Sequence, residues 1–168
     1  MKAGPRYRVK PRRQREGKTN YRRRLKLLKS GKTRMVIRKS SKNTQVQFIE
    51  YHEGGDKIIA NAISKELTKL YKWKYSTSTT PAAYLTGILA GKRAKDKGVK
   101  NVVIDIGNYP PVTGSKLFAS LKGAIDAGLE CPHDEKKIPN EDRIMGKHLD
   151  KNIMSAIEDI KNKIIGGK

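Results

Sequence analysis

Two β-rich runs, "RMVIRKS" (34–40) and "QVQFIEY" (45–51), decide the fold that this chain adopts. Both are rich in branched and aromatic residues, and the polar turn "SKNT" (41–44) separates them, so they predict a β-hairpin. In "KIIANAIS" (57–64), Ile59, Asn61 and Ile63 alternate with Ala60 and Ala62 as in a third strand, although the same letters can begin a helix. We favour the strand, which extends the hairpin to a three-stranded meander.

Helices and one further strand follow the meander. Apolar residues at helical spacing predict three helices. These helices span residues 65–73, 81–98 and 115–128. Ser64 is expected to cap the first helix and Thr80, followed by Pro81, the second. "NVVIDI" (101–106) is a short apolar run typical of a strand buried on both faces. This order predicts an α/β fold, in which a mixed β-sheet packs against helices.

Positive charge is concentrated at the N-terminus. The chain has 38 Lys and Arg against 16 Asp and Glu, a net charge of +22. Residues 1–42 carry 18 of these cations and one acid, Glu16, which leaves only +5 for the other 126 residues. One acid among so many cations allows little pairing within the chain, so this imbalance predicts a polyanionic partner.

The first 33 residues form what we call the arm. Residues 1–18 have too few apolar side chains to offset their ordering entropy, so we expect them to be disordered in the free protein. "TNYRRRLKLLKSG" (19–31) predicts a short helix, with Thr19 as its cap and Gly31 as its stop. Its apolar residues form a narrow stripe that we expect to rest on protein. The stripe consists of Tyr21, Leu25 and Leu28.

The arm suits a nucleic acid better than a membrane. Its apolar stripe contains neither Trp nor Phe, which disfavours insertion into a lipid surface. Arginine can fork onto phosphates, and Tyr7 and Tyr21 can stack on bases. No apolar stretch reaches the roughly 20 residues that span a bilayer, and no secretory signal is present. The single cysteine, Cys131, fits a reducing, intracellular compartment.

Two loops are further candidate anion sites. The turn after the first strand offers Lys39, Ser40, Lys42 and Asn43 as donors, although it could equally be a merely soluble turn. "TGSK" (113–116) stands at a helix start, where free backbone N–H groups favour an anion. Thr113 and Ser115 can instead simply cap that helix, and the sequence favours this simpler role.

The sequence offers little for catalysis or metal binding. Asp105 has no clustered carboxylate partners, as a metal-dependent nuclease would need. The three histidines and Cys131 share no metal-ligand spacing. Gly87 and Gly91 are one residue too close for a phosphate-binding loop and lie inside a predicted helix, where glycine permits close packing. We therefore expect no enzyme activity, no cofactor and no metal.

The last 39 residues differ from the rest of the chain. Residues 130–168 carry eight acids and eight bases and contain one amphipathic pattern. Its members are Leu149, Ile153, Ile157, Ile160 and Ile164. They predict a peripheral helix packed on the domain or on a partner. The chain is thus divided into the arm (1–33), an α/β core (34–129) and a C-terminal extension (130–168).

Four blocks in this order resemble one protein family. They are "TNYRRRLKLLKSGKTRMVIRKS" (19–40), "PAAYLTGILAGKRA" (81–94), "VVIDIG" (102–107) and "TGSKLFASLKGAIDAGLECPH" (113–133). Residues 5–148 are similar to the archaeal form of the universal L-eighteen family of large-subunit ribosomal proteins. The eukaryotic relative in that family is the 5S-rRNA-binding large-subunit protein five. The resemblance also implies that "KIIANAIS" is a strand.

The resemblance implies a structural, non-catalytic component of the cytoplasmic ribosome. It would bind 5S rRNA and help to attach it to 23S rRNA in the central protuberance, beside neighbouring proteins that include the universal L-five protein. The predicted RNA-binding residues lie in the arm, the adjoining strands and the "TGSK" turn. They are Arg6, Tyr7, Arg8, Lys10, Arg12, Arg13, Arg15, Lys18, Thr19, Tyr21, Arg22, Arg23, Arg24, Lys26, Lys29, Arg34, Arg38, Lys39, Ser40, Lys42, Asn43, Gln45, Thr113, Ser115 and Lys116.

Two other functions stay open on the residues alone. A nucleic-acid enzyme on a ribonuclease-like sheet could use the arm to grip its substrate, although Asp105 lacks the partners it would need. A DNA-packaging or regulatory protein would also need a basic arm. RNA cleavage separates the first alternative, and competition between RNA and duplex DNA separates the second.

Overall fold

A four-stranded mixed sheet lies at the centre of the protein. The computed structural model describes residues 4–150 and 152–166. The strands are β1 (Thr33–Lys39), β2 (Thr44–Glu50), β3 (Lys57–Ile63) and β4 (Val102–Asp105). They lie in the order β3-β2-β1-β4, with β1, β2 and β3 antiparallel and β4 parallel to β1. The predicted meander and the mixed α/β sheet are therefore confirmed.

Alternation along the strands gives the sheet two different faces. Met35 and Ile37 of β1 are fully buried with Phe48 of β2 in the hydrophobic core. Arg34 and Arg38 alternate with these residues along β1, so they project from the opposite face. The sheet thus presents an apolar face to the core and a face with two arginines on the other side.

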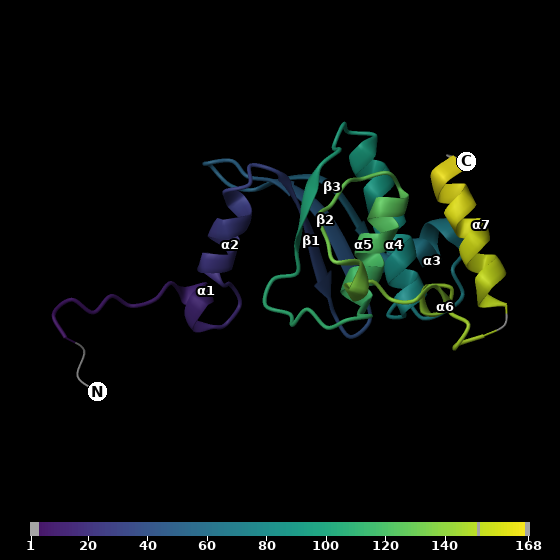
Figure 1. The fold of residues 1–168 in the computed structure, drawn as a ribbon, viewed down its shortest axis with the longest axis horizontal. Coiled ribbons are helices and arrows are strands. Elements are labelled where there is room, and N and C mark those ends of the chain that lie inside the picture. The colour runs from purple at the N-terminus through teal and green to yellow at the C-terminus, as the bar shows by residue number, and fades with distance from the viewer. Residues whose placement is uncertain (1–3, 151, 167–168) are drawn as a thin grey trace.

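Helices cover the apolar face. α3 (Ser64–Tyr71), α4 (Thr80–Lys95) and α5 (Lys116–Asp126) pack against the strands. The 3₁₀ turn η1 (Glu135–Lys137), α6 (Glu141–Ile144) and α7 (Ile153–Gly166) follow along the chain. In Figure 1, α4 and α5 stand beside the sheet and α7 packs on their outer side. The buried residues of α7 are Ile153, Ile157, Ile160 and Ile164, as the amphipathic pattern predicted. Leu149 lies before the helix and is 46% exposed, so it does not extend this apolar face.

Glycines allow α4 and α5 to pack closely. A Cβ atom on Gly87 would lie 2.1 Å from the carbonyl oxygen of Ser120, and one on Gly123 would lie 2.2 Å from that of Tyr84. Real carbon–oxygen contacts do not come so close, so any larger residue would push the helices apart. The expectation that glycine permits close helix packing here is confirmed.

Two predicted helix caps are wrong by one residue. Thr79 caps α4, accepting from the N–H of Ala82 at 3.4 Å, so Thr80 is already helical. Ser64 is likewise the first residue of α3, and its hydroxyl accepts from the N–H of Thr44 at 3.0 Å. Ser64 is needed by the neighbouring strand, and this explains why it does not cap its own helix.

The position of β4 also differs from the prediction. β4 lies at the edge of the sheet with β1 as its neighbour, and its Val103 and Ile104 are only half-buried. It is therefore not buried on both faces, contrary to the prediction from the apolar run. An apolar run of four residues does not reveal whether a second strand pairs with it.

The arm lies across the sheet from α4 and α5. It contains α1 (Arg12–Arg15) and α2 (Tyr21–Leu28), and neither of these fully described helices buries a residue. Figure 1 places both helices at the opposite end of the molecule from α7. Across residues 4–150 and 152–166, the structure contains no helix with the length and apolar character needed to cross a membrane.

Candidate nucleic-acid interface

The arm presents its cations to solvent. Its exposed basic residues, among those that the structure describes, are Arg6, Arg8, Lys10, Arg12, Arg13, Arg15, Lys18, Arg22, Arg23, Lys26, Lys29 and Lys32, whereas Arg24 is half-buried. Two tyrosines are exposed among them, Tyr7 at 64% and Tyr21 at 40%. This surface therefore combines groups that can pair with phosphates and rings that can stack on bases.

The apolar stripe of α2 does not rest on protein as predicted. Tyr21 is exposed, and Leu25 is 56% exposed, whereas Leu27 and Leu28 are half-buried. The cap differs as well, because Asn20 accepts from the N–H of Arg23 at 3.1 Å. Of the predicted stripe, Leu28 is thus turned inward, together with Leu27 and the arginines that bind the core.

Thr19, the predicted cap of α2, has a different role. Its hydroxyl accepts from Nε of Arg13 at 2.9 Å, which joins α1 to the segment before α2. This bond closes the loop between the two helices.

Two arginines tether α2 to the core. Arg23 donates through Nη1 to the carbonyl oxygen of Gly107 at 2.8 Å. Arg24 donates through Nη2 to Oδ2 of Asp56, also at 2.8 Å. These charged hydrogen bonds hold α2 against the core, since α2 has no buried side chain with which to pack.

Arg34 is enclosed beneath this tether. Its side chain is 2% exposed, and it donates to Asp56 at 2.7 Å and to Asp105 at 3.3 Å. Its guanidinium group is buried between these two carboxylates. The structure thus places Arg34 beneath the interface, where it supports the groove, and its contact with RNA stays a prediction.

Asp56 is held in its ionised form by these arginines. Burial acts to raise the pKa of Asp56, but hydrogen bonds and positive charge from Arg24 and Arg34 outweigh it. The pKa therefore lies below the ordinary value. Asp56 carries a full negative charge at neutral pH, directly beneath a basic surface.

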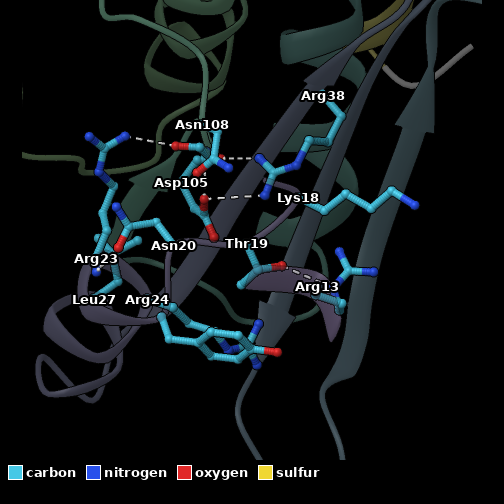
Figure 2. A pocket seen from close by; sticks show the side chains of 12 residues that line it. Arg13, Lys18, Thr19, Asn20, Arg23, Arg24, Leu27, Arg38, Asp105 and Asn108 are labelled. Carbon is cyan, nitrogen blue, oxygen red and sulfur yellow. Dashed lines mark hydrogen bonds and ion pairs between the residues drawn. The ribbon is translucent and has the colours of Figure 1, made fainter. Parts of the chain in front are cut away.

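A groove runs between the arm and the sheet. The residues that line it are Arg13, Lys18, Thr19, Asn20, Tyr21, Arg23, Arg24, Leu27, Arg38, Asp105, Gly107 and Asn108. Figure 2 shows Asn20 and Arg23 of the arm beside Asp105 of the sheet, at this hollow. Of the described residues that line it, five are cationic and one is acidic. The groove is therefore suited to an anion.

The turn between β1 and β2 closes on itself. Ser40 donates its N–H to the carbonyl oxygen of Asn43 at 2.7 Å, and its hydroxyl accepts from the N–H of Asn43 at 2.9 Å. Lys39 and Lys42 stay exposed beside this turn, and Gln45 is half-buried. These positions project two cations but do not line the groove, so their contact with RNA stays a prediction.

The "TGSK" turn is tied to the C-terminal extension. Gly114 donates its N–H to the carbonyl oxygen of Lys137 at 3.0 Å, and Lys137 donates to the hydroxyl of Thr113 at 3.4 Å. Ser115 occupies the cap position of α5, but its hydroxyl makes no hydrogen bond. Lys116 is half-buried as the first residue of α5. The structure does not bring these residues to the groove.

The candidate catalytic groups have other partners. Asp105 is paired with Arg34 and Arg38, each at 3.3 Å. Burial raises the pKa of the Cys131 thiol to about 11, so the thiol stays protonated at neutral pH. Over the part of the chain that the structure describes, no three His, Cys, Asp or Glu side chains gather as metal ligands would.

Sequence reasoning missed three residues of the core that bind the arm. Asp56, Gly107 and Asn108 meet the arm, and Asn108 donates its side-chain N–H to the carbonyl oxygen of Gly17. Gly107 has a left-handed φ of +64°, which brings the loop after β4 round to face the arm. The glycine directly after an apolar strand could have indicated a tight turn, but nothing local identified the partner of Asp56.

Comparisons with known proteins agree on one family. The family model described as "Ribosomal large subunit proteins 60S L5, and 50S L18" matches residues 5–101. Over 149 residues the chain is 54% identical to the large ribosomal subunit protein uL18 of Aeropyrum pernix, which covers 89% of this chain and 70% of that protein. It is 52% identical over 149 residues to uL18 of Korarchaeum cryptofilum, covering 89% of this chain and 76% of that protein.

Proposed function

Since this chain belongs to the family of large-subunit ribosomal proteins described as 60S L5 and 50S L18, we propose that its arm binds 5S rRNA. The protein is a structural, non-catalytic component of the large ribosomal subunit and serves translation on cytoplasmic ribosomes. Our proposal adds that it helps to attach 5S rRNA to 23S rRNA in the central protuberance.

The exposed cations of the arm carry this proposal. Eleven basic side chains between Arg6 and Lys29 are exposed, and Glu16 is the acid among them. Folded RNA is a dense polyanion, and neutralising its phosphates releases counterions and drives binding. Exposed Tyr7 and Tyr21 add stacking surfaces suited to unpaired bases, which a duplex DNA does not offer.

We propose a division of labour along the chain. The arm (1–33) contacts RNA, the core (34–129) holds the arm in place, and the extension (130–168) stabilises the core through α7. The apolar contacts of α7 on α4 support this last role. Neighbouring proteins of the central protuberance, including the universal L-five protein, would then bind surfaces that the RNA leaves free.

Competition binding tests the proposal. Labelled 5S rRNA is bound to the full chain at about 0.15 M salt and challenged with unlabelled 5S rRNA, an unrelated folded RNA or duplex DNA. We expect 5S rRNA to compete at least about tenfold better than either alternative, a difference of about 1.4 kcal/mol. Equal competition by duplex DNA would contradict the proposal and favour a general nucleic-acid-binding protein.

A further inference from the structure

Two acidic side chains lie within the basic interface. Asp105 lines the groove, and Asp56 lies beneath α2. Simple electrostatics predicts that an acid near a phosphate weakens binding, so a neutral residue would serve an anion site better. Their contacts indicate a different role.

Asp56 joins the arm to the sheet. One of its oxygens, Oδ2, accepts from Arg24 of α2 at 2.8 Å and from Arg34 of β1 at 2.7 Å. Without this shared carboxylate, α2 loses one of its two arginine tethers. Arg34, which is 2% exposed, loses the nearer of its two counter-charges.

Asp105 organises the other side of the groove. Its Oδ1 accepts from the N–H of Gly107 at 2.8 Å and from Nη2 of Arg38 at 3.3 Å. The carbonyl oxygen of Gly107 is the acceptor for Arg23 of α2. Asp105 therefore holds the loop that receives the second tether and adds a counter-charge for Arg38, whose Nη1 also donates to the carbonyl oxygens of Ile37 and Asp105 at 2.8 Å.

We propose that Asp56 and Asp105 are positioning residues for RNA binding: they hold the arginines of the arm and sheet in one groove, preorganised for a phosphate group. This inference rests on the proposed function. It predicts that removing a negative charge here weakens binding of a polyanion, which is the opposite of what simple electrostatics predicts. Preorganised donors bind more tightly because less ordering is left to be done on binding.

The decisive experiment compares two neutralised acids on one loop. Asp56→Asn and Glu53→Gln remove the same charge from the segment between β2 and β3, but Glu53 is exposed and lies outside the network. Binding of both full-length variants to a 5S rRNA transcript is measured at about 0.15 M salt. We expect Asp56→Asn to bind about tenfold more weakly and Glu53→Gln to bind as the parent or slightly better.

A second pair of variants tests whether Asp56 acts through the arm. In the Arg24→Gln variant, the bond between Arg24 and Asp56 is already absent. Adding Asp56→Asn to that variant should therefore weaken RNA binding by a smaller factor than in the parent chain. A structural role without connection to the arm would give the same loss in both backgrounds. Thermal unfolding of each variant confirms that folded proteins are compared.

The outcomes separate this inference from the proposed function. If the parent chain binds 5S rRNA no better than duplex DNA, the proposed function fails. If the parent binds but Asp56→Asn binds as tightly or more tightly, the proposed function stands and this inference is wrong. Should Asp56→Asn not fold, Asp105→Asn decides with the same two outcomes, because it removes the carboxylate charge that pairs with Arg38 and accepts from the N–H of Gly107.

Discussion

The arm and the pair α4–α5 are built on opposite principles. In α4, thirteen of sixteen residues are buried, and backbone meets backbone at Gly87 and Gly123. In α1 and α2, all of whose residues are described, no side chain is buried, and cations cover the surface. One region gains its stability from close apolar packing, whereas the other is held by a few charged hydrogen bonds.

This difference separates folding from binding. Repulsion among the arm's cations is offset only when an anion neutralises them, so the arm contributes little to the stability of the free protein. The core needs no RNA to bury its side chains. Substitutions in the core should therefore change stability, and substitutions in the arm should change affinity for RNA.

The largest expected effect is on stability. Gly123→Ala places a methyl group 2.2 Å from the carbonyl oxygen of Tyr84, so α4 and α5 must separate, at a cost of about 3 kcal/mol. Gly4→Ala makes the same chemical change in the arm, where no atom lies within 4 Å, and should cost less than about 0.5 kcal/mol. Urea denaturation of both variants measures the difference, and equal losses would remove the contrast between the two regions.

A smaller effect is expected on affinity. Arg22→Gln removes an exposed arm cation and should weaken binding to 5S rRNA about three- to tenfold, with unchanged unfolding. Lys163→Gln removes the same charge from α7, at the opposite end of the molecule, and should leave affinity unchanged. Fluorescence titration measures both. An equal loss from Lys163→Gln would mean that charge acts without regard to position.

The smallest effect concerns pH. The pKa of Asp56 is lowered in the folded protein, so its contribution to stability is fully present above the unfolded pKa of about 4 and is lost as pH falls through the folded value. The difference in unfolding free energy between parent and Asp56→Asn should therefore be constant from about pH 7 to 5 and shrink below about pH 4. Denaturation across this range measures it. A difference that grows on acidification contradicts the assignment.

Local pattern was enough to predict the sheet's meander and the C-terminal helix. Alternation placed Met35 and Ile37 on one face of β1, and the isoleucines of α7 recur at helical spacing. Such local patterns do not predict how the arm attaches to the core. Arg24 meets Asp56 across 32 residues and Arg23 meets Gly107 across 84, so no local periodicity records either contact.

The same limit explains the wrong predictions for α2 and β4. Apolar residues usually face protein, so the pattern predicts that Tyr21 and Leu25 do. In the structure both are exposed, and arginines attach α2 to the core. The short run at β4 shows its apolar character but not its number of neighbouring strands. Both errors arise because a local pattern does not reveal which distant segment packs against a helix or strand.

The salt dependence of 5S rRNA binding tests the central claim most directly, because it counts the phosphates that the arm neutralises. For the full chain, contact with about six to ten phosphates predicts that log K falls against log salt with a slope of roughly −4 to −9. A chain that lacks residues 1–30 keeps the core, whose buried residues begin at β1, and should show a slope of roughly −1 to −2. Equal slopes for the two chains would contradict the account, since the arm would then contribute nothing to RNA binding.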